Sequence, residues 1–594
     1  MSKYPKLSKM MVRNFRAIKE SAEIELNDIV VLVGANNSGK STFLKAYDLA
    51  VNSEKITADD FPDCETNTQN FPEVEIHTIV DKDTAPKIDL WCDPIDSTTY
   101  IVKEKWTWKN TKDKPERVGY LVKESRWAKE SDTPRMPWAT DNVAGARRPK
   151  PHRVSTFDSP EVQSEAIKDI VITLLEEKIK KFKPKKQSDD FQTLIGKIES
   201  LKQEFTEISK EEVKNISDDI TEIVKKIIPN HEFIFSIEDA LKDDPLKIFD
   251  AKDIEIKFGV GDKLFPIINH GSGARRTLLW AVLKKLAEMG YEAKSSQKGK
   301  KYEEIKTSTC HILLMDEPEI SLHPMAIRDA CNVLYSLPDN DLWQVMVTTH
   351  TPNFIDLTKD HTTIIRVERE NDERIQTTTL YQAEAIKLTH DEKENLKLLN
   401  LVDPHVLEFF FGGKVLLVEG DTEFNAFNFI KDKERNRGNT IFSDLLVIRA
   451  RGKVQIALLM KILNHFKKNY FVLHDTDKLK AERKKIKKDD KGKEYIDRVE
   501  INNPAWTNNM KILENMSEFS TVYASYITFE VACFKEIINS GKPENIIEKL
   551  KDSGNYNLIK DILTGIIEQN LTNENFIKWT KIEELEEFVK KYPE

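Results

Sequence analysis

A glycine-rich turn between an apolar segment and a helical pattern constrains this chain more than any other feature. The turn, GANNSGKST over residues 34–42, follows the apolar run IVVLV over residues 29–33, which predicts a buried parallel strand. Glycines let several backbone N–H groups point at one phosphate, and the start of a helix adds a favourable dipole. The spacing G-x-x-x-x-G-K-[ST] therefore predicts a nucleotide-phosphate site made by Gly34, Asn36, Ser38, Gly39, Lys40, Ser41 and Thr42.

A second motif supplies the acids that such a site needs. The apolar run HILLMD ends in Asp316, which is followed by Glu317. In this arrangement Lys40 neutralises the terminal phosphates, Ser41 and Asp316 hold Mg²⁺, and Glu317 polarises the attacking water. A further apolar strand, WQVMVTTH, ends in His350, which is expected to sense the γ-phosphate. The expected cofactors of this half of the chain are ATP and Mg²⁺.

These motifs together resemble the ABC-type ATPase heads of the RecF/SMC class. The resemblance extends to NHGSGARR (residues 269–276), to SLHP (residues 321–324) and to the opening VRNFRAIKE (residues 12–20). In that class the Ser-Gly signature of one head completes the ATP site of another head. The resemblance thus implies that Ser272 and Gly273 act in trans, in a dimer of heads. No Q-loop glutamine is assigned.

The two halves of the predicted head are separated by a long insertion. Short alternating stretches between Phe71 and Val122 predict antiparallel strands. From Pro160 to Ile228 apolar residues recur at helical spacing with Lys and Glu between them. We interpret this region as a dimerisation arm, and the alternative is a solvated helical hairpin with only a packing role. The lysine-rich stretch Lys294–Glu304 predicts an exposed loop.

A second group of acids follows the head. After a predicted edge strand, TTIIRV over residues 362–367, the sequence KVLLVEGDTEF places Glu419 at the end of an apolar strand and Glu423 in the helix after it. The strand YFVLHDTD ends in Asp475 and Asp477, whose side chains point the same way. Four converging carboxylates repel one another unless a cation neutralises them, which predicts a hard-metal site for phosphodiester chemistry.

Strand–Glu-Gly–helix followed by strand–Asp-x-Asp resembles the TOPRIM fold of topoisomerases, bacterial primases and certain nucleases. The resemblance leaves open whether Glu423 or Asp421 is the helix acid. Glu530 is a candidate further metal ligand, with a surface carboxylate as the alternative. Lys542 is a candidate transition-state cation, with a turn residue as the alternative. In a two-metal arrangement, one ion lowers the pKa of the attacking water and the other stabilises the leaving oxygen.

Basic residues are gathered directly after the second acidic motif. The run from Lys478 to Lys493 holds nine basic residues and three acids, whereas the whole chain carries a net charge of −9. Most such runs are solvated loops. The position beside the proposed metal site favours contact with a phosphate backbone. Trp506 is expected to pack rather than to stack on a base.

An interrupted ABC head followed by a TOPRIM region resembles the OLD (overcoming lysogenization defect) family of ATP-dependent nucleases. The implied fold is α/β: an ABC-type P-loop ATPase head with an inserted helical dimerisation arm, followed by a TOPRIM domain. The predicted divisions are an N-lobe over 1–155, the arm over 156–245, a C-lobe over 246–400 and the TOPRIM domain with C-terminal helices over 401–594.

The resemblance also implies an activity and partners. The activity is Mg²⁺-dependent DNA cleavage or nicking, with Mn²⁺ as a substitute ion and ATP in control. The role is that of an antiviral defence effector of the Gabija or retron kind. The partners are DNA, further copies of the chain, and a defence-system protein or a retron nucleic acid. The first alternative is a non-cutting RecF/SMC-like scaffold gated by ATP. A TOPRIM topoisomerase is a weaker one, because Tyr470 is a poor candidate nucleophile.

Composition sets the expected compartment. Five scattered cysteines without a C-x-x-C pair disfavour a disulfide framework or a zinc ribbon and suit a reducing environment. The first residues lack the apolar core of a signal peptide. No stretch reaches the roughly 18 apolar residues of a membrane helix. We therefore expect a cytoplasmic protein with no membrane association.

Overall fold

The computed structural model divides the chain into two compact units, over residues 1–379 and 380–594. It describes residues 5–66, 69–139, 141–145, 147–155, 159–179, 211–225, 232–237, 254–261, 263–296, 310–320, 322, 324–339, 341–370, 374–488, 494–536 and 542–591. The predicted boundary at 400/401 falls within helix α9 (His390–Val402), whereas contacts divide the chain before that helix. Among the described residues, no helix combines the length and apolarity that crossing a bilayer requires.

Unit 1 is built on two large sheets and a small third one. The largest is antiparallel and runs β2-β1-β4-β6-β7-β8, with β5 beside β6. Its strands are β1 (Lys6–Phe15), β2 (Ile18–Glu25), β4 (Glu73–Asp81), β5 (Cys92–Pro94), β6 (Thr99–Thr107), β7 (Glu116–Leu121) and β8 (Arg126–Trp127). The antiparallel strands predicted between residues 71 and 122 are therefore confirmed.

The second sheet carries the nucleotide motifs and runs β16-β15-β3-β14-β13-β9. Its strands are β3 (Ile29–Val33), β9 (Lys150–Ser155), β13 (His311–Asp316), β14 (Trp343–Thr348), β15 (Thr362–Arg369) and β16 (Ile375–Gln382). β3, β13 and β14 are buried along their whole length, as expected for parallel strands covered on both faces. The predicted edge strand 362–367 is wrong: β15 lies between β3 and β16, and its apolar residues are buried.

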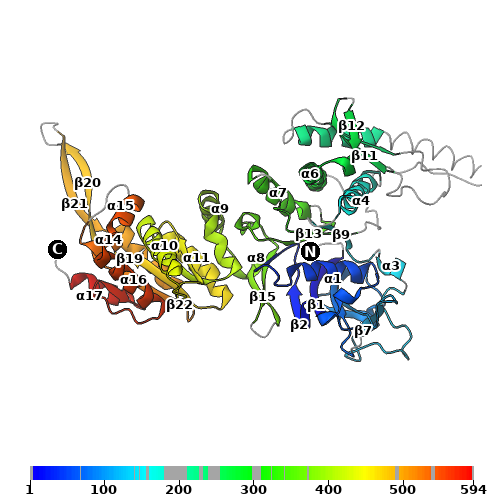
Figure 1. The fold of residues 1–594 in the computed structure, drawn as a ribbon, viewed down its shortest axis with the longest axis horizontal. Helices are drawn as coiled ribbons and strands as arrows, with labels where there is room; N and C mark the ends of the chain where they lie inside the picture. The colour runs from blue at the N-terminus through cyan, green and yellow to red at the C-terminus, as the bar shows by residue number, and fades with distance from the viewer. Residues whose placement is uncertain are drawn as a thin grey trace, which may run out of the picture. The chain divides into compact units, whose positions relative to one another are not determined.

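Helix α1 (Lys40–Val51) lies between the two sheets and fills the core of unit 1. Phe43, Leu44 and Tyr47 pack there against residues of both sheets, such as Met10 and Leu314. On the other side of the parallel sheet lie α4 (Pro160–Ile179), α6 (Ser272–Ser296) and α7 (Pro324–Ser336), which contact one another in sequence (Figure 1).

The insertion is described only in part. α4 and the helical residues 211–225 fit the predicted helical character. Lys285 of α6 forms an ion pair with Asp219 of the second helical stretch at 2.8 Å. A small antiparallel sheet follows, with β10 (Glu232–Ile237), β11 (Ile254–Val260) and β12 (Lys263–Pro266). The remainder of the predicted arm and most of the predicted loop Lys294–Glu304 lie outside the described residues.

Unit 2 is a second α/β layer structure. Its sheet runs β18-β17-β19-β22-β23, and all pairs except the last are parallel. The strands are β17 (Lys414–Val418), β18 (Leu445–Arg449), β19 (Tyr470–Asp475), β22 (Ser520–Ser525) and β23 (Phe576–Lys578). The helices among its described residues are α8 (Ala383–Ile386), α9, α10 (Asp421–Asn436), α11 (Lys453–Leu463), α12 (Pro504–Thr507), α13 (Asn509–Glu514), α14 (Phe529–Phe534), α15 (Lys542–Lys549), α16 (Ser553–Ile567) and α17 (Ile582–Lys590).

Most of the described part of the basic run is a strand and not a loop. Residues 480–488 form β20 (Lys480–Lys488), which pairs in antiparallel register with β21 (Glu494–Asn502), and residues 489–493 lie outside the described residues. In Figure 1 this hairpin extends away from the rest of unit 2. In an antiparallel pair, hydrogen bonds between the two strands keep the backbone of both strands extended. A solvated loop has no such regular pairing. Trp506, in α12, is buried, which confirms its predicted packing role.

Candidate functional sites at two sheet edges

The turn after β3 has the backbone that the glycine pattern predicts. Gly34 has φ +143°, and a Cβ there would lie 2.2 Å from the carbonyl oxygen of Val367. Gly39, at the N-terminus of α1, has φ +98°. Residues that carry a side chain rarely adopt backbone conformations with these positive φ angles, so both positions require glycine. The turn wraps around Lys40, whose Nζ donates to the carbonyls of Gly34 and Ala35 at 3.2 and 2.9 Å.

The carboxylate of Asp316 joins the two nucleotide motifs. Its Oδ1 accepts hydrogen bonds from Ser41 Oγ at 2.7 Å and from Thr348 Oγ1 at 2.6 Å. Thr348 was not among the predicted residues, and its only sequence signal is its place at the end of a buried strand. These contacts link residues about 275 and 32 positions apart in the chain. The structure therefore brings together Ser41 and Asp316, the two residues predicted to hold Mg²⁺ in this half of the chain.

Glu317 and His350 face one another. The backbone N–H of Glu317 donates to Thr348 Oγ1 at 3.0 Å, and the residue has φ +48°. His350 Nε2 lies 3.0 Å from Glu317 Oε1. Burial and the charge of Lys40 lower the pKa of His350, while Glu317 opposes that shift. The net shift favours the neutral imidazole, which lies beside the carboxylate of Glu317.

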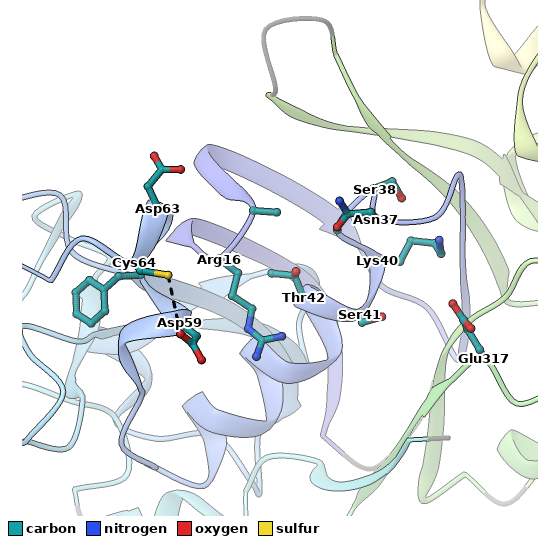
Figure 2. A pocket seen from close by; sticks show the side chains of 13 residues that line it. Arg16, Asn37, Ser38, Lys40, Ser41, Thr42, Asp59, Asp63, Cys64 and Glu317 are labelled. Atoms are coloured by element: carbon teal, nitrogen blue, oxygen red, sulfur yellow. Dashed lines mark hydrogen bonds between the residues drawn. The ribbon is translucent and has the colours of Figure 1, made fainter. Parts of the chain in front are cut away.

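A cavity of about 450 Å³ opens beside this cluster. Figure 2 shows Lys40, Ser41 and Glu317 on one side of it and Arg16 on the other. Of the two neighbouring asparagines of the loop, Asn37 lines the cavity and the predicted Asn36 does not. The remaining lining residues are Ala17, Ser38, Gly39, Thr42, Asp59, Phe61, Asp63 and Cys64. Burial lowers the pKa of Lys40, and Glu317, Asp316 and Glu319 partly offset this.

Arg16 is a cavity residue that the motifs did not single out. Its guanidinium donates to Asp60 Oδ1 at 2.8 Å, and Lys45 of α1 reaches the same oxygen at 2.8 Å. This buried carboxylate therefore fixes two cations, one of which comes from the middle of α1. The Asn-Phe-Arg sequence at residues 14–16 supports the family resemblance, but it does not predict the contact between Arg16 and Asp60.

The predicted signature residues lie elsewhere in unit 1. Ser272 and Gly273 are exposed at the start of α6, and no atom lies within 4 Å of a Cβ built on Gly273. Neither residue lines the cavity around Lys40. They are thus placed where a second molecule has access to them.

The second site lies at the carboxyl ends of β17 and β19. The backbone N–H of Asp475 donates to Glu419 Oε2 at 3.1 Å. Asp475 Oδ1 accepts from Ser525 Oγ at 2.7 Å and from the N–H of Phe529 at 2.8 Å. Partial burial, together with the charges of Glu423 and Glu419, raises the pKa of Asp475 well above its usual range. The two strand-end acids are therefore held in place and repel further negative charge.

Two more acids approach from the flanking helices. Glu423, in the first turn of α10, is 3% exposed, and its Oε2 lies 3.1 Å from a Cβ built on Gly420. Asp421 is instead 42% exposed and forms an ion pair with Arg449, so Glu423 is the helix acid that faces Asp475. Glu530 is buried in α14 and accepts from Thr422 Oγ1 at 2.6 Å, which excludes the surface alternative.

The last acid of the motif has a different partner. Asp477 Oδ2 forms an ion pair with Nζ of Lys453, the first residue of α11. Lys453 was missed, and its signal was the Arg-Gly-Lys turn after an apolar strand. Lys542 begins α15, and its side chain lies outside the described part of the chain.

The donor set fits a hard divalent cation. Within the described ranges no three carboxylate, imidazole or thiol groups already stand at chelating distance of one another. The charges of Glu423 and Glu419 nevertheless contribute, after burial, to the raised pKa of Asp475. Carboxylate oxygens in this number are the ligands that Mg²⁺ and Mn²⁺ prefer.

Comparisons with known proteins match a family model to part of each unit. The family described as AAA ATPase domain matches residues 6–355, and the overcoming lysogenization defect protein-like TOPRIM domain matches residues 410–477. An OLD nuclease of Thermus scotoductus is 23% identical over 79% of this chain and 82% of its own length. The Old nuclease of Escherichia phage P2 is 22% identical over 93% of this chain and 91% of its own length.

A solved structure aligns with part of the chain as well. The Smc head bound to the C-winged helix domain of ScpA covers 64% of this chain and 99% of its own, with a TM-score of 0.36 and 15% identity. The matched families account for the fold class expected from the motifs: a P-loop ATPase domain followed by a TOPRIM domain.

Proposed function

We propose that this chain, which belongs to the AAA ATPase domain family and continues into an OLD-like TOPRIM domain, is a Mg²⁺-dependent DNA endonuclease whose cutting is controlled by ATP. The observation that carries the proposal is the cluster of Glu419, Asp475, Glu423 and Glu530 at one end of the unit 2 sheet. Four carboxylates without a cation would be costly there.

The chain's own residues prepare this cluster for a cation. Ser525 and the N–H of Phe529 hold Asp475 through one oxygen, and the N–H of Asp475 holds Glu419 through one oxygen. These contacts fix the orientation of both acids before anything binds. A bound divalent ion would supply a more acidic water and neutralise charge at the scissile phosphate, with Mn²⁺ able to replace Mg²⁺.

The head supports control by ATP. Lys40, Ser41 and Asp316 are arranged for a nucleotide and its metal ion, and Glu317 is held beside His350 for hydrolysis. The exposed Ser272 and Gly273 would complete the ATP site of a second copy, so the working form is a homodimer or a higher oligomer.

The hairpin β20–β21 supports DNA as the substrate. Basic residues dominate β20, which starts three residues after Asp477. Electrostatic contact with a phosphate backbone would hold DNA near the acidic cluster. Resemblance to the OLD family extends the proposal to antiviral defence, with a partner protein or a retron nucleic acid as the silencing or triggering component.

A supercoiled-plasmid assay tests the nuclease. Wild type with Mg²⁺ or Mn²⁺ should nick or linearise the plasmid, and Glu419→Gln should lower the rate by at least about a thousandfold, since metal sites supply several kcal/mol of transition-state stabilisation. Glu514→Gln, the same change at an exposed position of unit 2, is the matched control. Equal behaviour of wild type and Glu419→Gln on every DNA form would leave the ATP-gated scaffold as the better function.

A further inference from the structure

The acidic site of unit 2 divides into two parts with different charge. One part holds Asp475, whose pKa is raised by burial and by the charges of Glu423 and Glu419, with a smaller contribution from Asp477. Glu530 joins this part through Thr422. The other part holds Asp477 and the ammonium of Lys453, which form an ion pair. A divalent cation is drawn to the first part, whereas the second already contains a cation.

Lys453 is built into its position. Its side chain is 2% exposed, and besides Asp477 its Nζ donates to the carbonyl oxygens of Thr476 and Ala505, both at 3.4 Å. Three oxygens from two places in the chain therefore surround the ammonium, as oxygen ligands surround a metal ion. A lysine that served only surface solvation would keep its ammonium in water.

The partner of Lys453 is also held. Asp477 has φ +62°, and its N–H donates to the carbonyl of Ile527 at 3.0 Å. The carbonyl of Thr476 accepts from Asn509 Nδ2 at 3.0 Å, and Asn509 is fully buried. On the other side, the N–H of Gly452 donates to the carbonyl of Glu419 at 3.1 Å, which ties the start of α11 to the first acid of the cluster.

We propose that Lys453 is the second cation of this site. The chain then binds one divalent ion at Glu419 and Asp475, and the ammonium of Lys453 stands where a second ion would otherwise be held by Asp477. This rests on the proposed nuclease function and changes one part of it: Asp477 serves as the partner of Lys453 and not as a metal ligand in the wild-type protein. A lone buried ion pair with no link to metal binding is the structural alternative.

Mn²⁺ binding to the full-length, nucleotide-free protein tests the proposal directly. The ions that belong to unit 2 are those lost in Asp475→Asn, and any ion of the head is identified in parallel with Asp316→Asn. We expect one Mn²⁺ of unit 2 per chain by calorimetry, with the electron paramagnetic resonance spectrum of an isolated ion. Two ions with a spin-coupled spectrum, or none, would overturn the proposal.

A variant then asks whether Lys453 keeps the second ion out. Lys453→Met frees Asp477 and should raise the count from one to two ions, whereas Lys453→Arg keeps a cation and should leave it at one. Lys461→Met is the control, because Lys461 lies on the same helix and pairs with Glu392 at 2.8 Å. A folded Lys453→Met that still binds one ion would show an ion pair without a metal-related role.

The nuclease proposal and the proposal for Lys453 are contradicted by different results. A wild type that nicks plasmid and binds two coupled ions contradicts the role of Lys453 and leaves the nuclease intact. A wild type that binds one ion and leaves every plasmid form uncut contradicts the nuclease and leaves the cation count standing.

Discussion

The acids of the two units end parallel strands in the same way but have different neighbours. Asp316 of unit 1 accepts from the hydroxyls of Ser41 and Thr348, with the ammonium of Lys40 in the same cluster. Asp475 of unit 2 is surrounded by further carboxylates, which raise its pKa. The site of unit 1 combines an ammonium, hydroxyls and carboxylates, which suits the binding of an anion together with its metal ion. The site of unit 2 concentrates carboxylates, which suits the binding of a metal ion alone.

The largest expected effect tests whether the two sites act separately. Lys40→Ala removes the buried ammonium of unit 1 and should weaken ATP binding by about a hundredfold or more, because a charge-assisted phosphate contact is lost. Mn²⁺ binding at unit 2 should be unchanged. Calorimetric titration of both ligands measures this, with Lys55→Ala at an exposed position as control. Wild-type affinity for ATP in Lys40→Ala would contradict the assignment of the nucleotide site.

The next effect concerns what each site needs from outside its own unit. We propose that Ser272 of one copy completes the ATP site of a second copy. Ser272→Arg should therefore prevent ATP-dependent dimer formation and lower ATP hydrolysis about tenfold or more. The reason is steric and charge repulsion at the exposed start of α6. Sedimentation velocity with and without ATP detects the change, and Ser97→Arg is an exposed control. An unaltered dimer in Ser272→Arg would remove the trans role.

A smaller effect tests how unit 2 reaches DNA. Changing Lys484, Lys485, Lys487 and Lys488 to Gln removes four charges from β20 and should reduce the slope of log affinity against log salt by about three, as fewer counterions are released. The same number of exposed lysines elsewhere in unit 2, at 511, 535, 551 and 578, forms the control set. A slope unchanged relative to wild type would leave the hairpin without a role in DNA contact.

The smallest effect measures the charge difference itself. The raised pKa of Asp475 means that its ionised form costs stability above the usual titration range of an aspartate, and the cost disappears as the pH falls below that range. Asp475→Asn should therefore raise the melting temperature in EDTA at pH 7 by about 3 °C, with a smaller gain at pH 4.

The same variant should lose the stabilisation that Mg²⁺ gives wild type. Thermal unfolding followed by circular dichroism checks both statements. A lower melting temperature of Asp475→Asn in EDTA at pH 7 would mean that the hydrogen bonds of Asp475 outweigh the repulsion.

Local sequence was enough for the elements that carry the motifs. The glycine turn at residues 34–42 and the acids that end β13, β17 and β19 lie where the apolar runs predicted them. Such motifs are readable because an apolar run, a turn and a helix start are each determined by neighbouring residues. The same reasoning failed for β15, whose place inside the sheet depends on a strand that follows it.

The sequence by itself thus determined which functional motifs the chain carries and their order along it. These are a phosphate-binding turn, the acids that accompany it, a second acidic cluster and a basic run. What only the tertiary structure decided is which groups meet. Glu423 rather than Asp421 faces Asp475 because α10 turns one acid inward and leaves the other to Arg449. Asp477 pairs with Lys453 because the start of α11 is brought to the end of β19. Spacing along the chain carries no information on such contacts, since they depend on how helices pack on a sheet.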